Sequence, residues 1–151
     1  MAGAQDRRIR GVATPRKEAL SETEYRTLAE FRYMLRRFLN RSAAAARSAN
    51  LTPHQHQALL AIRGYGGGSI SIGELAEKLM VKHHSAGELV ERLLQAGLVE
   101  RRADPADRRR VFVSLSARAR GLLATLSTIH LEELRLIQPS LQRLLAKLED
   151  R

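Results

Sequence analysis

Five arginines and two aspartates fall within ten residues of this sequence, in the segment RRADPADRRR that spans residues 101–110. An arginine guanidinium is always charged, planar and weakly hydrated, which suits it to a narrow, electronegative DNA groove. Between the arginine clusters, Asp104 and Pro105 are the residue types preferred at the first two positions of a tight turn. The segment is therefore predicted to be a rigid loop that presents positive charge to a nucleic acid.

The flanking residues predict that this loop joins the two strands of a β-hairpin. Val111, Val113 and Leu115 occupy every second position, which is the period of a strand buried on one face. On the other side, Leu98 opens the first strand directly after Gly97. A glycine in this place ends a helix, because the residue that follows a helix often takes a positive φ. We therefore expect a helix, a strand, the basic loop and a second strand, in that order.

Two short helices are expected before the hairpin. Ser71 and Glu74 have the spacing of a capping box, which begins the first of them. The second is expected over residues 83–96 and ends at Gly97. Two consecutive short helices with a tight turn between them and a hairpin after them predict a helix-turn-helix with a wing.

Longer elements are expected on the N-terminal side of this unit. Ser21 and Glu24 form another capping box, and they begin a helix over about residues 22–48 with an apolar stripe at helical spacing. A third capping box, Thr52 with Gln55, begins the next helix and has proline at its first position.

On the C-terminal side, a second long helix is expected over residues 117–137. Pro139 is expected to end it, because proline has no amide hydrogen and clashes with the preceding turn. A last helix over residues 140–148 carries four leucines at helical spacing. These leucines are Leu141, Leu144, Leu145 and Leu148. They either pack against the first helix of the same chain or form a symmetric dimer interface, and we favour the dimer.

The composition of the chain agrees with a polyanion as partner and argues against several other classes. Its 151 residues suffice for one domain with a hydrophobic core, and its formal net charge is +10. Since cysteine is absent, disulfides and thiol redox chemistry are excluded. The sequence has no run of about 18 apolar residues, and its N-terminus lacks the apolar core of a secretory signal. A cytoplasmic protein without a membrane partner is expected, with residues 1–20 as a flexible basic arm.

Three blocks of the sequence together resemble the multiple antibiotic resistance regulator (MarR) family of bacterial winged-helix transcription factors. They are LTPHQHQALLAI, SIGELAEKLMV and LVERLLQAGLVERRADPADRRRVFVSLSARAR, and the resemblance covers about residues 22–148. It implies a mainly α-helical fold with a small β-hairpin wing, and a homodimer formed by helices at both ends of the chain. It also implies a repressor that leaves a pseudo-palindromic operator when a small aromatic or anionic ligand binds.

The resemblance also divides the chain into parts with different partners. After the arm, residues 21–50 would form the N-terminal dimerisation helix, 51–116 the winged helix-turn-helix DNA-binding domain, and 117–151 the C-terminal dimerisation helices. The implied partners are double-stranded DNA, a second copy of the chain and a small effector. Nothing in the sequence indicates a cofactor.

In the hairpin, the resemblance implies that Arg108 and Arg109 enter the minor groove. The other arginines expected to contact DNA are Arg101, Arg102 and Arg110. Asp104 and Asp107 either hold the loop and orient arginine through charge-assisted hydrogen bonds, or are ordinary solvated carboxylates of a turn.

The second helix of the helix-turn-helix is expected to read the major groove from its exposed N-terminal positions. These positions are His83, His84, Ser85, Gly87 and Glu88, and Lys82, just before the helix, is expected to contact DNA phosphate. Many family members have a basic residue at the position of Glu88 and a hydroxyl at that of Gly87, so this chain departs from the common pattern. Glu88 either accepts a hydrogen bond from a cytosine amino group or forms a capping box with Ser85. The capping box is the favoured alternative.

By resemblance, an effector would bind between the long helices and the winged domain. The candidate polar contacts are Tyr33, Arg36, Arg37, His54 and His130, although residues of these types more often have a surface or core-edge role. A metal site is not expected, because adjacent histidines such as His83 and His84 cannot share one helical face. The sequence has neither a phosphate-binding glycine loop nor a nucleophile beside a histidine, so it does not indicate an enzyme.

Two functions remain as alternatives at this point. The first is a dimeric, sequence-specific DNA-binding transcriptional regulator that represses its genes until a ligand binds. The second is a winged-helix adaptor for other proteins that has only non-specific affinity for DNA. The five arginines between residues 101 and 110 favour the regulator, because an adaptor does not need them.

Overall fold

The computed structural model describes residues 19–148, which fold into five α-helices and three short strands. The helices are α1 (Glu22–Ser48), α2 (Pro53–Gly64), α3 (Ile72–Leu79), α4 (His83–Gln95) and α5 (Ala117–Ala146). The strands are β1 (Ser69–Ser71), β2 (Val99–Ala103) and β3 (Val111–Leu115), and a 3-10 turn, η1 (Gly66–Gly68), precedes β1. The arm expected at residues 1–20 lies almost entirely outside the described residues.

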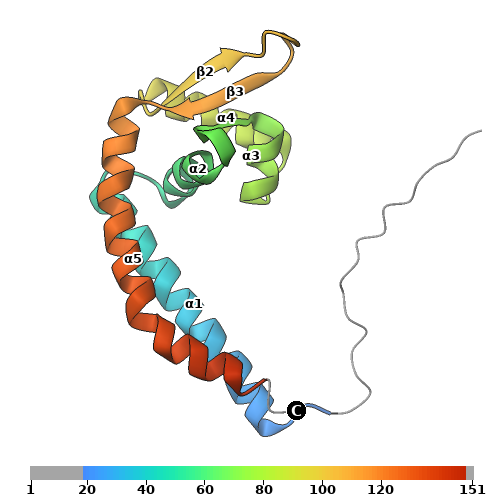
Figure 1. Ribbon diagram of the computed structural model, residues 1–151, viewed down its shortest axis with the longest axis vertical. Coiled ribbons are helices and arrows are strands. Elements are labelled where there is room, and N and C mark those ends of the chain that lie inside the picture. The colour runs from blue at the N-terminus through green and yellow to red at the C-terminus, as the bar shows by residue number, and fades with distance from the viewer. Residues whose placement is uncertain (1–18, 149–151) are drawn as a thin grey trace, which may run out of the picture.

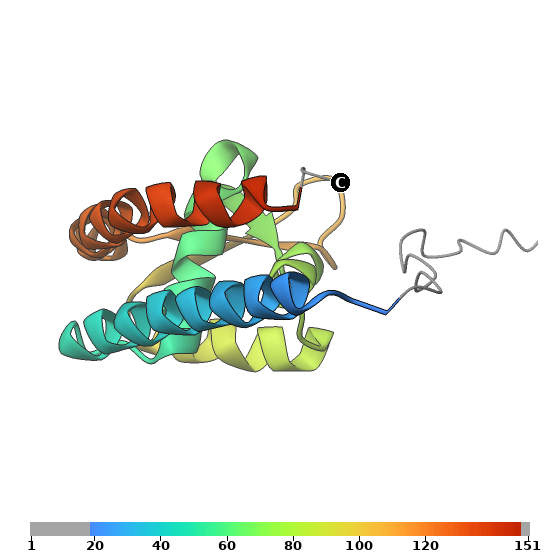
Figure 2. The ribbon, with the colours of Figure 1, turned by 90° about the horizontal axis from the view of Figure 1, so that it is seen from below.

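The elements form two regions (Figure 1). Helices α1 and α5 lie against each other and are called the helix pair below. At one end of this pair sits the winged domain, residues 51–116, which contains α2, α3, α4 and the sheet. Figure 2 shows that α1 starts and α5 ends at the same end of the molecule, so the two helices run antiparallel. None of the described helices is long and apolar enough to cross a membrane.

The sheet has the order β1-β3-β2, and both of its pairings are antiparallel. Ile70 is the middle residue of β1 and pairs with Val113. The largest fully buried side chains all belong to the winged domain. They are Leu59, Ile62, Ile70, Leu75, Leu93, Val90 and Val113. The predicted helix-turn-helix with a hairpin wing is therefore confirmed, and its buried core extends to Ala46 of α1 and to Ala119, Leu123 and Leu126 of α5.

Local signals in the sequence set the helix starts. The capping boxes expected at Ser21, Thr52 and Ser71 are all formed, each with hydrogen bonds in both directions. At α2, for example, the Gln55 amide donates to Thr52 Oγ1 at 3.1 Å, and the Thr52 amide donates to Gln55 Oε1 at 2.9 Å. Gly97 has a φ of +67°, which confirms it as the residue that ends α4.

The prediction that Pro139 ends a helix is wrong, because α5 continues through it as one helix of 30 residues. The missing amide hydrogen of Pro139 leaves the Arg135 carbonyl without its usual helical partner. Both residues lie on the exposed side of α5, where water can hydrogen-bond that carbonyl. Beyond the proline, Leu144 is 3% exposed because it packs against α1. Contacts on both sides of Pro139 thus hold one continuous helix.

Candidate DNA-binding interface

The loop at the tip of the wing is closed by its own hydrogen bonds. The Asp104 amide donates to the Arg110 carbonyl at 2.8 Å, and the Arg110 amide donates to the Asp107 carbonyl at 2.8 Å. Each aspartate also accepts from the backbone two residues on, Asp104 from Ala106 at 2.9 Å and Asp107 from Arg109 at 3.0 Å. These contacts fix the backbone that carries Arg108 and Arg109.

One arginine at the base of the wing is paired with the helix beside it. Arg101, on β2, donates from Nη1 to Glu91 Oε1 on α4 at 2.6 Å. The pair is an ion pair at the surface that joins the hairpin to α4, beside the direct packing of β2 on α4. Arg101 was expected to contact DNA, and its charge is already compensated by Glu91 in the free protein.

A second arginine, Arg110, is held against α3. Its Nη2 lies 3.7 Å from Glu74 Oε1, and its guanidinium stacks 5.3 Å from the centroid of the Phe112 ring. Hydrogen bonds from Ser71 and then from the Tyr65 hydroxyl lower the pKa of Glu74 to about 2, and Arg110 adds to the effect. The hydrogen bond between the Tyr65 hydroxyl and Glu74 in turn raises the pKa of Tyr65. Glu74 therefore stays ionised and keeps Arg110 at the base of the wing.

The other three arginines of the hairpin differ from these two. Arg102, Arg108 and Arg109 are exposed, and within residues 19–148 their side chains form no hydrogen bond or ion pair. We refer to them as the unpaired wing arginines. Their positive charge is not compensated by the protein, so it is available to an external anion.

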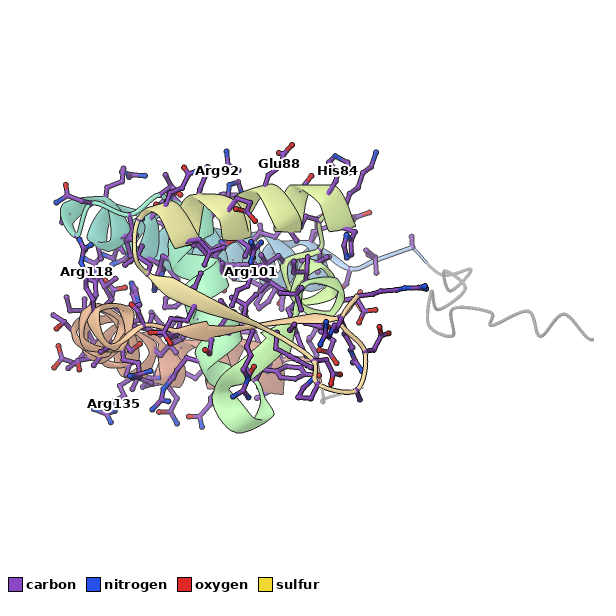
Figure 3. The ribbon with its side chains drawn as sticks, turned by 90° about the horizontal axis from the view of Figure 1, so that it is seen from above. His84, Glu88, Arg92, Arg101, Arg118 and Arg135 are labelled. Atoms are coloured by element: carbon purple, nitrogen blue, oxygen red, sulfur yellow. The ribbon has the colours of Figure 1, made fainter. Side chains whose placement is uncertain are left out.

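Helix α4 begins at His83, with Lys82 as its N-cap residue. His83, His84 and Glu88 are exposed as expected, whereas Ser85 and Gly87 are only half-exposed. Figure 3 shows His84, Glu88 and Arg92 projecting from the outer edge of α4, away from the hairpin. These three residues are spaced by four, so they form one row along the helix. Arg92 was missed by the sequence analysis, although its spacing from His84 and Glu88 was a usable signal.

The capping box expected between Ser85 and Glu88 does not form. Since α4 starts two residues before Ser85, Ser85 lies inside the first turn, and the N-cap residue Lys82 makes no capping hydrogen bond with its side chain. The sequence signal was ambiguous because a hydroxyl followed three residues later by glutamate also occurs inside helices. Glu88 therefore has no capping role here.

The candidate effector contacts are dispersed. Tyr33 lines a hollow of about 310 Å³ between α1 and α5, and Arg37 lines a neighbouring one of about 280 Å³. Arg36 and His54 are exposed, and His130 is buried. Neither of these two hollows gathers all five residues.

His130 instead stacks on a histidine that the sequence analysis did not select. The rings of His56, on α2, and His130, on α5, have centroids 4.9 Å apart, and the Phe38 ring of α1 meets His130 edge-on at 6.3 Å. The Nε2 atoms of both histidines are buried without a hydrogen-bond partner among the described residues. Burial lowers the pKa of His56, and the nearby His130 lowers it further. The spacing of His56 with Leu59 and Ile62 marked it as an inward-facing residue of α2.

The four C-terminal leucines do not behave alike. Leu144 is buried within the chain, whereas Leu145 and Leu148 remain 46% and 51% exposed. Leu141 is half-buried and lines an apolar hollow between α1 and α5. In the part of the chain that the structure describes, no cluster of three or more side chains is suited to hold a metal ion.

The arrangement of α2–α4 and the sheet defines the class of the protein, a winged helix-turn-helix with a DNA-binding regulator fold. The sequence profile of the MarR family matches residues 49–110. No curated protein sequence matches the chain, but many solved structures share its fold. AbsC, a MarR family transcriptional regulator from Streptomyces coelicolor, has 19% identity and a TM-score of 0.69 over 82% of this chain and 84% of that one.

Two further structures extend this likeness. A mutant of MepR from S. aureus, bound to an oligodeoxyribonucleotide, has 18% identity and a TM-score of 0.63 over 82% of this chain and 97% of that one. A probable transcriptional regulator from Pseudomonas aeruginosa has 32% identity and a TM-score of 0.56 over 78% of this chain and 96% of that one. The chain belongs to the MarR family of transcriptional regulators, and its family and neighbours are regulators rather than enzymes.

Proposed function

We propose that this MarR family member is a homodimeric, sequence-specific DNA-binding repressor that a small aromatic or anionic ligand releases from its operator. The observation that carries the proposal is that the wing lies beside α4 (Figure 3). An α-helix fits the major groove of B-DNA. With α4 in that groove, the unpaired wing arginines would reach the flanking minor groove, whose negative potential attracts arginine.

The paired arginines support the same proposal in a different way. Arg101 and Arg110 join the hairpin to α4 and α3 through Glu91 and Glu74, so these ion pairs favour the position of the wing beside the reading helix. A rigid spacing between a major-groove element and a minor-groove element reduces the entropy lost on binding. The solved complex of the MepR mutant with an oligodeoxyribonucleotide shows that a protein of this fold binds DNA.

The exposed apolar surface of the helix pair supports a homodimer. Side chains that are 39–75% exposed line both helices, and such a surface is typical of an obligate interface. They are Leu28, Phe31, Leu35, Leu39, Ile129, Leu131, Leu134, Leu136, Leu145 and Leu148. Two copies related by a two-fold axis would present two α4 helices to a palindromic site with half-sites about one helical turn apart.

The proposed ligand follows from the resemblance to the family and from the chemistry between the helices. The hollow lined by Arg37 also contains the apolar side chains of Phe38 and Ile137, and its Glu133 carboxylate is paired with Arg41 at 3.5 Å, so Arg37 is the cation left for a ligand. An aromatic carboxylate or phenolate matches such a lining, because guanidinium binds the anion and the walls cover the ring.

The test is selection of bound duplexes from a random DNA pool, followed by affinity measurements by fluorescence anisotropy at several salt concentrations. The wild type should enrich a pseudo-palindrome. Arg108→Ala should weaken binding to it by more than about tenfold, because it removes a cation from the minor groove. Arg135→Ala is the matched control, since it removes the same charge from an exposed position on α5, far from α4 (Figure 3).

Dimerisation of both variants is checked by sedimentation velocity and should be unaffected. Wild-type affinity in Arg108→Ala would contradict the role of the wing. If no sequence is enriched and all binding disappears as salt rises, the protein has only non-specific affinity. The adaptor function would then replace the repressor.

A further inference from the structure

The two carboxylates in the middle of α4 have different surroundings. Glu91 accepts a hydrogen bond of 2.6 Å from Arg101, so its charge serves to join α4 to the wing. Glu88, one turn earlier, is exposed and has no hydrogen bond or ion pair among residues 19–148. Because α4 begins at His83, Glu88 does not cap the helix either. No contact within the described chain accounts for this carboxylate.

Its place on the helix gives Glu88 access to whatever α4 contacts. His84, Glu88 and Arg92 form one row on the outer edge of α4 (Figure 3). Neighbours in this row are four residues apart, which is about 6 Å along the helix axis. Glu88 is thus the centre of the row, one helical turn from a histidine and one from an arginine.

We propose that Glu88 selects a cytosine in the operator by accepting a hydrogen bond from the cytosine N4 amino group in the major groove. The inference rests on the proposed DNA binding by α4. Guanine and thymine present acceptors at this edge, which repel a carboxylate. Adenine presents a donor beside the N7 acceptor. Cytosine presents a donor with no acceptor next to it, so it is the base that a carboxylate tolerates best.

The negative charge of Glu88 makes the selection of cytosine stricter than a neutral side chain at this position would make it. Without a donor, a carboxylate in the groove is desolvated and repelled by the phosphates, so DNA lacking the cytosine is bound less well. The affinity lost there is supplied elsewhere by the unpaired wing arginines, Arg102, Arg108 and Arg109. The wing therefore holds DNA of any sequence, and Glu88 discriminates between sequences.

The test compares the motifs that the wild type, Glu88→Gln and Glu88→Ala select from a random duplex pool. The wild type should require cytosine at one position of each half-site, by about tenfold over other bases. Glutamine has the same shape and pairs with adenine N6 and N7, so Glu88→Gln should change that position to adenine. Glu88→Ala should lose the preference there and bind non-specific DNA more tightly than the wild type. Glu132→Gln, at an exposed position of α5, is the matched control and should select the wild-type motif.

The outcomes separate this inference from the function on which it rests. If the wild type selects no motif, the proposed sequence-specific binding fails before any variant is compared. If the wild type selects a palindrome and both Glu88 variants select the same one, α4 binds DNA and the role of Glu88 is refuted. A changed preference at a position other than a cytosine would refute it as well. Because Glu88 is exposed and unpaired in the described chain, circular dichroism should show both variants folded as the wild type.

Discussion

In α2 of the winged domain, Leu59 and Ile62 have no exposed surface, whereas in α1 of the helix pair Leu28 and Leu35 are 50% and 46% exposed. Both helices carry an apolar stripe at helical spacing, so the sequence pattern alone does not distinguish them. The difference lies in what covers the stripe. Within one chain, α2 packs against α3 and the sheet and also against α1 and α5, whereas α1 has mainly α5 and α2 beside it.

The two regions also differ in the exposed side chains that the proposed function uses. The winged domain exposes charge, in the unpaired wing arginines and in the row His84, Glu88 and Arg92. The helix pair exposes leucine, isoleucine and phenylalanine. A charged surface suits DNA, and an apolar one suits a second protein surface. The winged domain thus buries its largest apolar side chains within one chain, whereas the helix pair leaves many of its own exposed.

The largest effect is expected inside the winged domain. Leu59→Ala should lower the free energy of unfolding by about 2–5 kcal/mol, because it leaves a cavity in a fully packed core. Leu60→Ala, at the next position of α2 but 48% exposed, should lower it by about 1 kcal/mol or less. Urea unfolding followed by circular dichroism at fixed protein concentration measures both. Equal losses would mean that the buried Leu59 contributes no more to stability than the exposed Leu60.

In the helix pair, the expected effect falls on assembly instead. Leu35→Glu should raise the dissociation constant of the dimer by roughly 100-fold or more, because a symmetric interface would bury two new carboxylates. Leu60→Glu is the matched control, since this leucine has nearly the same exposure but belongs to the winged domain. Sedimentation velocity over a range of concentrations gives both constants. A dimer that tolerates Leu35→Glu as well as Leu60→Glu would exclude this face of α1 from the interface.

Most of the winged domain could be predicted because its signals are local. Each capping box joins residues three apart, Gly97 ends a helix by its own backbone preference, and alternation within five residues marks β3. The basic loop and its turn residues were equally visible. The candidate DNA-binding residues could therefore be named from the sequence, although their contacts with DNA remain predictions.

Features that depend on distant residues could not be predicted. Pro139 is a local signal to end a helix, but packing against α1 beyond it keeps α5 continuous. The pairing of Arg101 with Glu91 and of Arg110 with Glu74 depends on how the hairpin folds back onto α4 and α3. The sequence showed five similar arginines, and only the fold separates the two that hold the wing from the three that remain unpaired.

The smallest effect is expected where the two regions meet, at the stacked rings of His56 and His130 beside Phe38. Burial and then the neighbouring His130 lower the pKa of His56 below its usual value of 6.5, so the folded protein disfavours the charged ring. The unfolded chain then binds more protons in this range. The stability due to neutral His56 is complete above pH 6.5 and is lost as the pH falls from 6.5 toward the lowered pKa.

Chemical denaturation between about pH 5 and 8 should therefore give an unfolding free energy that rises with pH up to about 6.5, by at most about 1.4 kcal/mol per pH unit for one histidine. Near this junction, Glu133 on α5 and Arg41 on α1 form an ion pair, with 3.5 Å between Glu133 Oε1 and Arg41 Nη1. His56→Gln should flatten the slope, because the titrating ring is gone. His54→Gln, which changes the exposed histidine of the same helix, should leave the slope as in the wild type. An unchanged slope in His56→Gln would show that the junction between the winged domain and the helix pair does not respond to protons through this residue.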